Sequence, residues 1–285
     1  MKVLIGITSK NRAAILPKAI NSALEQVNID KKVVVFDDAS TDKTADLQYL
    51  YTNIQWIISK EPKGLVYARN MFLEISNAEY FCSLDDDAWF LTDDSLSKAI
   101  NYMDENPGVA VVGFDMLTPD RSEITKHQIV PEKTNEYIGC GHVLRVNIVK
   151  KVGKYIPFPN FYGAEEKDLC IRLIDEGCDI IKLNGLYVWH DKTNIARDVF
   201  KQKRSGICND LVYMYRRSPP ILLIAIIFYK LLIHFIANTK EKNKYALKAY
   251  FLGVKDFIHF ILSGKGDRKP VSYKGFIKFV KLSKK

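Results

Sequence analysis

Short apolar runs alternate with helix-length amphipathic segments over the first half of the chain, and this alternation limits the possible folds more than any other feature. The apolar runs are VLIGI (3–7), KVVVF (32–36), IQWII (54–58), EYFCSL (79–84) and VAVVGF (109–114), and helices are predicted near 13–26, 64–76 and 95–105. Continuous Val- and Ile-rich runs are typical of parallel strands covered on both faces. The pattern therefore predicts an α/β fold with a mostly parallel central sheet flanked by helices.

After residue 115 the regular alternation of apolar runs and helix-length segments ends, and longer irregular segments follow. Within them, a strand is predicted at 138–145 and a helix at 164–176. No Pro- or Ser-rich linker divides the two parts, so we expect the second part to be built onto the same sheet. A chain of 285 residues can form one large domain with an appendage. We predict a domain at 1–215 and a helical appendage at 216–285.

The positive charge of the protein is concentrated in its last segment. The formal net charge is +9, but residues 238–285 contain 13 Lys and Arg against three Asp and Glu. The preceding 237 residues contain 29 basic and 30 acidic residues. A basic nucleic-acid binder would need its charge on the binding domain, and no known nucleic-acid motif occurs. We therefore expect no nucleic-acid partner.

An apolar stretch opens the predicted appendage. It covers 17 residues, 221–237, after Pro219 and Pro220, and only Lys230 and His234 interrupt it. A spanning helix needs about 20 mostly apolar residues. We therefore predict a helix that lies in the membrane interface, followed by an amphipathic segment at 245–262. With the basic tail, these helices favour an anionic membrane surface as partner, whereas the alternative is a solvated charged tail.

The cysteines and the first residues bear on the cellular compartment. Five cysteines occur without C-x-x-C spacing, and their odd number favours reduced thiols over a disulfide framework. The apolar run at 3–7 is too short for a signal peptide and is predicted to be the first strand. We expect a cytoplasmic protein.

Three consecutive carboxylates, Asp85, Asp86 and Asp87, follow the apolar run EYFCSL. The C-terminal ends of parallel strands are where open α/β sheets bind ligands. Adjacent carboxylates repel one another unless a cation lies among them, and hard oxygens suit Mg²⁺ or Mn²⁺. The sequence predicts a divalent metal site here; the alternative is an acidic turn that caps the next helix.

The first two predicted strands end in TSKNRAAI and FDDASTDKT, and neither end is glycine-rich. The absence of G-x-G-x-x-G and of a P-loop disfavours a dehydrogenase, a P-loop enzyme and a nucleotidyltransferase. Asp37 and Asp38 stand at a strand end, where one carboxylate can accept a hydrogen bond from a base imide. The same residues also fit an ordinary turn with a helix N-cap.

Five motifs in this order, TSKNR, FDDASTDKT, GLVYARN, SLDDDAW and GAEEKDLCIRL, resemble a family 2 glycosyltransferase of the GT-A fold. The resemblance covers residues 1–215 and implies inverting transfer of a sugar from a nucleotide-diphosphate donor to a hydroxyl group. It favours a UDP- or dTDP-sugar, and a glycan or lipid-linked glycan acceptor in bacterial cell-envelope polysaccharide synthesis. The apolar helices and basic tail add the expectation that the protein lies at the inner face of the plasma membrane. The alternative is a catalytically inactive binding protein that keeps the fold.

The resemblance also implies roles for single residues on the donor side. Thr8, Arg12 and Asp38 would line the nucleoside pocket, and Arg69 of the ARN motif would orient the donor. The D-x-D pattern falls on Asp85 and Asp87.

Within the acidic run, Asp87 would be the direct metal ligand, and Asp85 would face the ribose or the water shell of the metal. Asp86 would contribute to donor binding. His190 takes the place of an additional metal ligand, and its imidazole would favour Mn²⁺.

The acidic pair of the last motif falls on Glu165 and Glu166, and Glu166 takes the place of the catalytic base. An inverting displacement needs such a base to take the hydroxyl proton. Either glutamate could reach the acceptor. Asp168 and Arg172, four residues apart on a helix, are predicted to form a structural pair.

Two aromatic residues, Trp89 and Tyr162, could stack on a sugar, although a place in the core is the favoured interpretation.

Overall fold

The structure, a computed structural model, describes residues 1–285 except 125–127, 161–162, 192–197, 242–244, 265 and 284–285. Its strands are β1 (Val3–Ser9), β2 (Lys31–Asp37), β3 (Gln55–Ile58), β4 (Tyr80–Asp85), β5 (Ala88–Phe90), β6 (Val109–Leu117), β7 (Val130–Thr134), β8 (Gly141–Arg145) and β9 (Asp179–His190). Its α-helices are α1 (Leu16–Leu24), α2 (Leu65–Ile75), α3 (Ser95–Glu105), α4 (Val146–Lys151), α5 (Glu165–Asp175), α6 (Val199–Arg217), α7 (Leu223–Lys240), α8 (Ala246–Leu262) and α9 (Tyr273–Leu282). Short 3₁₀ helices are η1 (Ala45–Tyr49) and η2 (Pro220–Leu222). The α/β architecture predicted from the sequence is confirmed.

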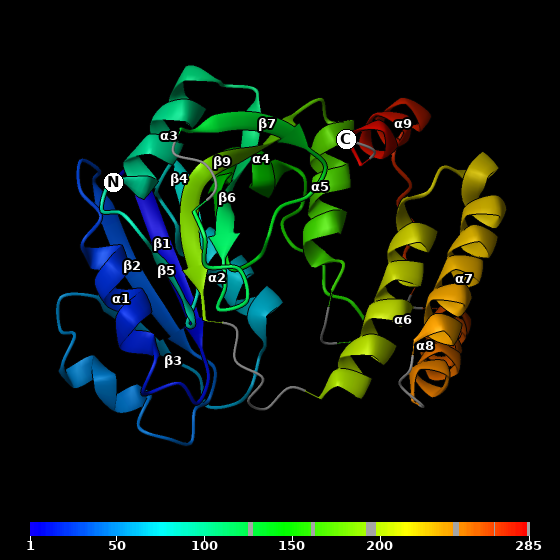
Figure 1. The fold of residues 1–285 in the computed structure, drawn as a ribbon, viewed down its shortest axis with the longest axis horizontal. Helices are drawn as coiled ribbons and strands as arrows, with labels where there is room; N and C mark the ends of the chain where they lie inside the picture. Colours follow the sequence, from blue (N-terminus) through cyan, green and yellow to red (C-terminus); the bar gives the residue numbers. More distant parts are fainter. Residues whose placement is uncertain (125–127, 161–162, 192–197, 242–244, 265, 284–285) are drawn as a thin grey trace.

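The described strands form one nine-stranded sheet in the order β3-β2-β1-β4-β8-β6-β9-β5, with β7 paired to β9 (Figure 1). From β3 to β4 the strands are parallel. Strand β8, however, is antiparallel to both β4 and β6. A parallel connection needs a long crossover, usually a helix, and the described residues between β6 and β8 contain none. The second half of the sheet is therefore mixed.

Side chains of β1 alternate between two hydrophobic layers. Ile5 and Ile7 pack into the layer formed with α1 and α3, whereas Leu4 packs into the layer formed with α2 and α5. At Gly6, an added methyl group would approach the ring of Phe72 on α2 to 2.5 Å. Glycine at this position therefore lets α2 lie directly on the strand.

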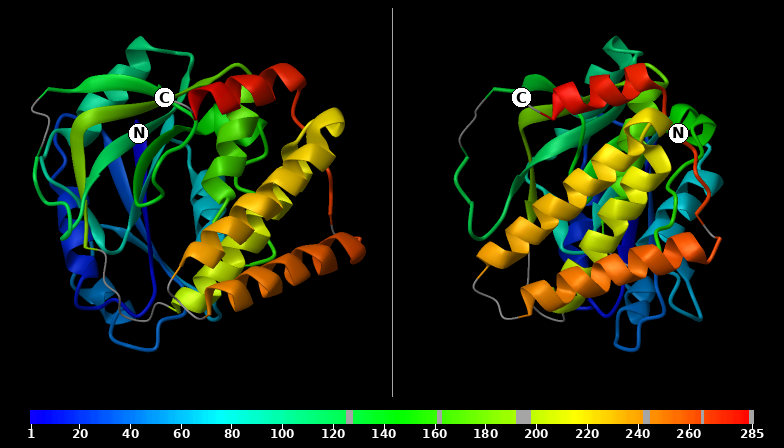
Figure 2. Two further views of the ribbon diagram at one scale, coloured as in Figure 1. Left: turned by 45° about the vertical axis from the view of Figure 1, so that its right-hand side comes forward. Right: turned by 90° about the vertical axis from the view of Figure 1, so that its right-hand side faces the viewer.

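The C-terminal helices form a layer of their own beside the sheet. Figures 1 and 2 show α6 between α5 and the pair α7 and α8, while α9 lies against α5. Asn135 donates a hydrogen bond to the carbonyl of Phe279 (3.1 Å), and Asp175 accepts one from the amide of Ser272 (3.1 Å), so α9 is tied back to the sheet domain. The boundary predicted at residue 215 falls within α6 and stays a prediction.

Asp168 joins α5 to α6 by a buried ion-pair cluster. Its fully buried carboxylate contacts Arg172 Nε at 2.8 Å, which confirms the predicted pair, and also Arg217 Nε at 2.6 Å. Both arginine side chains are less than a tenth exposed. Removing the acid would leave two buried cations without their counterion.

We therefore expect Asp168→Ala to lower the free energy of unfolding by about 3–5 kcal/mol in urea titrations followed by circular dichroism. The control is Lys151→Ala, which removes a pair with Glu176 whose side chains are 76% and 51% exposed. An exposed pair contributes up to about 1 kcal/mol. Equal losses in the two variants would contradict this account of the buried cluster.

Candidate active site

The C-terminal ends of β1, β2 and β4 meet at one edge of the sheet. Thr8 on β1 lies in register with Phe36 on β2 and with Asp85 on β4. A cavity of about 550 Å³ opens at this edge. It is lined by Thr8, Ser9, Lys10, Arg12, Asp38, Leu65, Asp85, Asp86, Asp87, Glu165, His190 and Lys201. The structure thus gathers eight of the ten site residues predicted from the sequence around one cavity, all except Arg69 and Glu166.

The loops after β1 and β2 are joined by hydrogen bonds from backbone amides to side-chain oxygens. Asn11, in the left-handed region (φ 55°), accepts a bond from the amide of Thr41 (2.7 Å) and donates its own amide to Ser40 Oγ (2.8 Å). The amide of Arg12 donates to Thr44 Oγ1 at 2.9 Å. These contacts explain why TSKNR and FDDASTDKT are rich in short polar side chains, and they fix the backbone of Arg12 at the cavity.

Asp38 connects the end of β2 to the start of α2. Its carboxylate accepts hydrogen bonds from the backbone amides of Lys63 and Gly64, and it is only 7% exposed. This arrangement holds the carboxylate at the cavity wall in one orientation.

A group that could hold a metal ion lies at the end of β4. Ligand atoms of Asp85, Asp87 and His190 lie within 4.8 Å of one another. The pairing of β5 with β9 sets His190 opposite Ala88, and His190 Nε2 lies 3.2 Å from Asp87 Oδ1. Asp85 Oδ1 and His190 Nδ1 are buried and have no hydrogen-bond partner in the described part of the chain. Two carboxylates and an imidazole with such unsatisfied atoms fit Mn²⁺ well and can also accept Mg²⁺.

Burial raises the pKa of two acids at this strand end, Asp85 and Asp86. Desolvation, together with repulsion from Asp85 and Asp87, raises the pKa of Asp86 to about 7, although Arg12 opposes the shift. Desolvation also raises the pKa of Asp85, and Arg69 opposes that shift. A divalent cation would favour the ionised form of each carboxylate and remove their mutual repulsion.

Arg69 does not line the cavity, but its guanidinium bonds to residues of β4, of α5 and of the segment before β8. The side chain is 1% exposed, and its Nη1 donates to Glu166 Oε1 at 2.7 Å. Nη2 donates to the carbonyl of Gly139 (2.8 Å), Nε donates to Ser83 Oγ (3.2 Å), and Asp85 Oδ1 lies 3.7 Å away. The guanidinium therefore fixes Glu166, while Glu165, the neighbouring acid, lines the cavity.

Some site residues could not be found by local motifs. Lys201 reaches the cavity from the start of α6, and no local pattern marks it. Lys10 belongs to TSKNR but its type indicates no specific role. Trp89 stacks on Trp189 with ring centroids 6.1 Å apart, and Tyr162 lies outside the described residues.

Comparisons with known proteins agree with this geometry. Residues 4–160 match the family model described as glycosyl transferase family 2. The chain is 27% identical over 189 residues to a protein of Bacillus subtilis named as a teichuronic acid biosynthesis glycosyltransferase, TuaG, covering 62% of this chain and 73% of that one.

Two solved structures have a similar fold. S. aureus TarS 1–349 in complex with UDP-GlcNAc is similar with a TM-score of 0.65 at 19% identity, covering 91% of this chain and 81% of that one. The mannosyltransferase PcManGT of Pyrobaculum calidifontis, in complex with GDP-Man and Mn²⁺, is similar with a TM-score of 0.62 at 15% identity, covering 93% and 79%. The predicted GT-A fold is thereby confirmed.

Gly139 is predicted to be essential for the packing around Arg69. A methyl group here would collide with Glu166 Oε1 and lie 2.9 Å from Arg69 Nη2. We expect Gly139→Ala to cost about 1–3 kcal/mol of unfolding free energy, because these buried side chains must shift. The control is Gly108→Ala, whose added methyl group meets no atom within 4 Å among the described residues. If Gly139→Ala unfolds at the same temperature as the wild type, the tight packing around Gly139 is contradicted.

Proposed function

Because the chain belongs to glycosyl transferase family 2, we propose that it moves a sugar from a nucleotide-diphosphate donor to a hydroxyl group in a metal-dependent, inverting reaction. The observation that carries the proposal is the convergence of Asp85, Asp87 and His190 within 4.8 Å. Arg12 and Lys201 line the same cavity. A phosphate-rich ligand bound together with a divalent cation accounts for a cavity lined by both acidic and basic side chains.

On the donor side, we propose that Thr8, Arg12 and Asp38 hold the nucleoside, and that Asp85 and Asp86 contact the ribose and the diphosphate region. All five line the cavity. UDP- and dTDP-sugars are the favoured donors, and the UDP-GlcNAc complex of the similar protein TarS supports the first.

Asp87 and His190 would hold the metal ion, which would stabilise the negative charge of the departing diphosphate when bound. The Mn²⁺ complex of the similar PcManGT supports this assignment, and Mg²⁺ is the second candidate. A carboxylate of the pair Glu165 and Glu166 would take the proton of the attacking hydroxyl group.

The proposed acceptor is a glycan or a lipid-linked glycan of the bacterial cell envelope. The similarity to a protein named for teichuronic acid biosynthesis supports an envelope polysaccharide. We place the protein in the cytoplasm, at the inner face of the plasma membrane.

Helix α7 supports this location. It is the helix in the described part of the chain whose length and composition would allow it to cross a membrane, and its apolar window is not buried. Its two ionisable residues inside the apolar stretch, Lys230 and His234, both contact Asp210 on α6, at 3.0 and 2.9 Å. The polar side of α7 therefore faces the protein, and a helix bound along one side in this way is expected to lie in the interface.

The outer face of α7 and α8 is apolar and bordered by basic residues. Its exposed apolar side chains are Ile224, Phe228, Tyr229, Leu232, Phe235, Ile236, Leu247, Phe251, Ile258 and Leu262, and Ile221 of the preceding η2 is exposed as well. Lys248 and Lys255 are exposed beside those of α8. An apolar face bordered by lysines fits the surface of an anionic membrane.

The proposed donor site predicts metal-dependent nucleotide binding. In calorimetric titrations with UDP, dTDP, GDP and AMP, we expect one nucleoside diphosphate to bind in the presence of Mn²⁺. Asp87→Ala should weaken that binding at least about tenfold, because a direct ligand is lost. The control Asp267→Ala removes a carboxylate whose side chain is 89% exposed and should leave binding unchanged. If no nucleoside diphosphate binds under any condition, the donor site is refuted.

Membrane binding is predicted to depend on the apolar face. Phe228 is 69% exposed, so Phe228→Glu should preserve the fold but lose about 2 kcal/mol of apolar burial in the interface. We expect the partition constant for phosphatidylglycerol vesicles, measured by co-sedimentation, to fall at least about tenfold. The matched control is Leu50→Glu, at an equally exposed apolar residue (76%) near η1. Undiminished binding of Phe228→Glu would exclude this face as the contact.

A further inference from the structure

Helices α7 and α8 enclose a groove on the side of the molecule away from the sheet. They meet where the hydroxyl of Tyr250 donates to the carbonyl of Leu231 (3.2 Å) and where the rings of Phe235 and Tyr250 pack with centroids 5.6 Å apart. From there the two helices diverge toward the start of α7 and the end of α8 (Figure 2). The space between them has a volume of about 460 Å³, and Tyr215 in the last turn of α6 lines its inner side.

The lining of the groove is apolar throughout. Its side chains come from α7 between residues 223 and 231 and from α8 between 257 and 262, and all are aliphatic or aromatic. Ile224 and Leu262, on opposite walls, are 85% and 80% exposed, so the described part of the chain leaves the groove open. Exposed apolar surface of this kind marks a binding site for an apolar partner.

The shape of the groove selects among apolar partners. A membrane surface can cover the exposed side chains of Phe228 and Ile258, which stand on the two helices that border the groove. It does not fill the space between them, and an unfilled apolar space loses the dispersion contacts of the atoms that line it. A single hydrocarbon chain can enter this space and contact both helices.

A fixed cation lies at the inner side of the groove. Arg268 donates from Nε to the carbonyl of Tyr215 (3.0 Å) and from Nη2 to the carbonyl of Ser218 (2.6 Å), and its guanidinium lies over the ring of Tyr215, 5.9 Å from the centroid. Its Nη1 forms no hydrogen bond in the described part of the chain. A guanidinium held in this way beside an apolar groove suits the phosphate of a lipid.

The next residue of α6 connects the groove to the catalytic domain. Arg216 follows Tyr215, and its Nη1 donates to the carbonyl of Pro157 (3.1 Å). Its guanidinium lies between two rings, 5.2 Å from the centroid of Phe158 and 5.1 Å from that of Phe260 on α8. One side chain therefore contacts both the groove helix α8 and the loop before α5.

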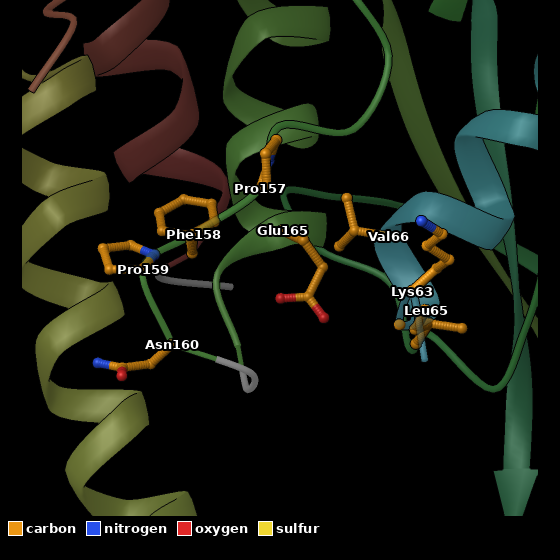
Figure 3. Close-up of a pocket in the computed structure, with 9 residues that line it drawn as sticks. Lys63, Leu65, Val66, Pro157, Phe158, Pro159, Asn160 and Glu165 are labelled. Atoms are coloured by element: carbon orange, nitrogen blue, oxygen red, sulfur yellow. The ribbon is translucent and has the colours of Figure 1, made fainter. Parts of the chain in front are cut away.

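That loop borders the proposed donor site. Figure 3 shows residues 157–160 between α6 and Glu165 at the start of α5, and Glu165 lines the donor cavity. The inner side of the groove is thus separated from the donor cavity by Arg216 and this loop.

The order of these features favours one occupant. A phospholipid of the surrounding membrane gains nothing from a head group near the donor cavity. A lipid-linked acceptor, in contrast, must bring its sugar to that cavity while its chain stays in apolar surroundings. The sequence of apolar groove, arginine and donor cavity corresponds to the sequence of chain, phosphate and sugar in such a molecule.

We propose that the groove between α7 and α8 binds the apolar chain of a phosphate-linked lipid acceptor, and that Arg268 pairs with its phosphate. This proposal rests on the proposed function and names the part of the acceptor that the C-terminal helices recognise. The helices then have two separate tasks, since their exposed outer side chains contact the membrane surface and the groove between them selects one lipid.

The first test measures binding of lipid phosphates without a membrane. The full-length protein is titrated calorimetrically with isopentenyl, geranyl and farnesyl monophosphate in the presence of EDTA, which prevents metal-dependent binding at the donor site. Each methylene group buried in the groove should raise the affinity about fourfold. We expect farnesyl phosphate to bind at least about 100-fold more tightly than isopentenyl phosphate. Equal affinities, or no binding of farnesyl phosphate, would overturn the proposal.

The second test fills the groove. Ile261→Trp adds a bulky ring to one wall and should weaken farnesyl phosphate binding at least about tenfold. The control Leu232→Trp places the same ring on the exposed face of α7, at a residue that does not line the groove, and should leave binding unchanged. Leu223→Trp, on the opposite wall, repeats the test should Ile261→Trp fail to fold. Equal binding by the groove variants and the control would rule out the groove as the site.

The role of Arg268 is tested by removing its charge. Arg268→Gln should weaken binding of farnesyl phosphate about tenfold and leave binding of the uncharged farnesol unchanged, because only the phosphate contact is lost. Lys269→Gln, at the neighbouring residue whose side chain is 74% exposed, is the control. If Arg268→Gln weakens both ligands equally, or neither, Arg268 does not pair with the phosphate.

Other occupants give different results. If soluble dihexanoyl-phosphatidylglycerol displaces farnesyl phosphate at a similar concentration, the groove accepts membrane phospholipid and the proposed occupant is wrong. Light scattering detects a second copy of the chain. A wild-type dimer that Ile261→Trp converts to a monomer, without farnesyl phosphate binding, would make the groove an interface between copies.

Calorimetry with UDP and Mn²⁺ separates this proposal from the proposed function. Wild type and Ile261→Trp should bind UDP alike. UDP binding without a preference for longer lipid chains would refute the groove proposal alone. Chain-length-dependent lipid binding without binding of any nucleoside diphosphate would refute the proposed function and, with it, an acceptor as the occupant of the groove.

Discussion

The buried guanidinium of Arg69 is the interaction on which the rest of the site depends. It lies 1% exposed between the end of β4, the segment before β8 and the start of α5. A buried cation is stable only when its hydrogen bonds and charge are satisfied. Asp85 and Glu166 supply that charge from two different elements. The same contact therefore holds the end of β4, which carries the candidate metal ligand Asp85, and the acidic end of α5 at a fixed separation.

Helix α6 holds several elements together outside the sheet, as Arg69 does at the end of β4. Its polar residues face three ways: Asn209 to the loop before α5, Asp210 to α7, and Arg217 to Asp168 on α5. The two ionisable residues that interrupt the apolar stretch are thus part of helix packing. They explain why α7 can be apolar enough for a membrane and still lie against a folded domain.

The sequence predicted the first half of the fold well because each strand there is a continuous apolar run that ends at a polar motif. It did not predict β9, whose residues Lys182, Asn184 and Gly185 interrupt the apolar pattern, and it did not predict α6, whose polar residues bond to distant parts of the chain. These elements depend on tertiary contacts that no local pattern contains. Lys201 was missed for the same reason.

The ordered motifs predicted most of the residues that line the cavity at the end of β4, because the ends of neighbouring parallel strands must meet. They could not separate Glu165 from Glu166, since adjacent residues at a helix start can point to either side. The direction depends on the positive φ angles of Gly163 and Ala164 and on which carboxylate reaches Arg69.

The distribution of charge around Arg69 gives the neighbouring acids different tasks. Glu166 is paired with the guanidinium, whose Nη1 lies 2.7 Å from Glu166 Oε1. Glu165 lies beside Glu166 without a cation of its own, so burial and repulsion raise its pKa toward neutrality. Asp85 and Asp86 are also destabilised as anions, but they lie with Asp87 and His190, where a divalent ion can compensate them. Environments that push the pKa values of nearby acids apart are how one site can hold a metal ion and a base at neutral pH. In this protein, these acids share one buried arginine, which pairs with Glu166 and opposes the upward pKa shifts of Asp85 and Glu165.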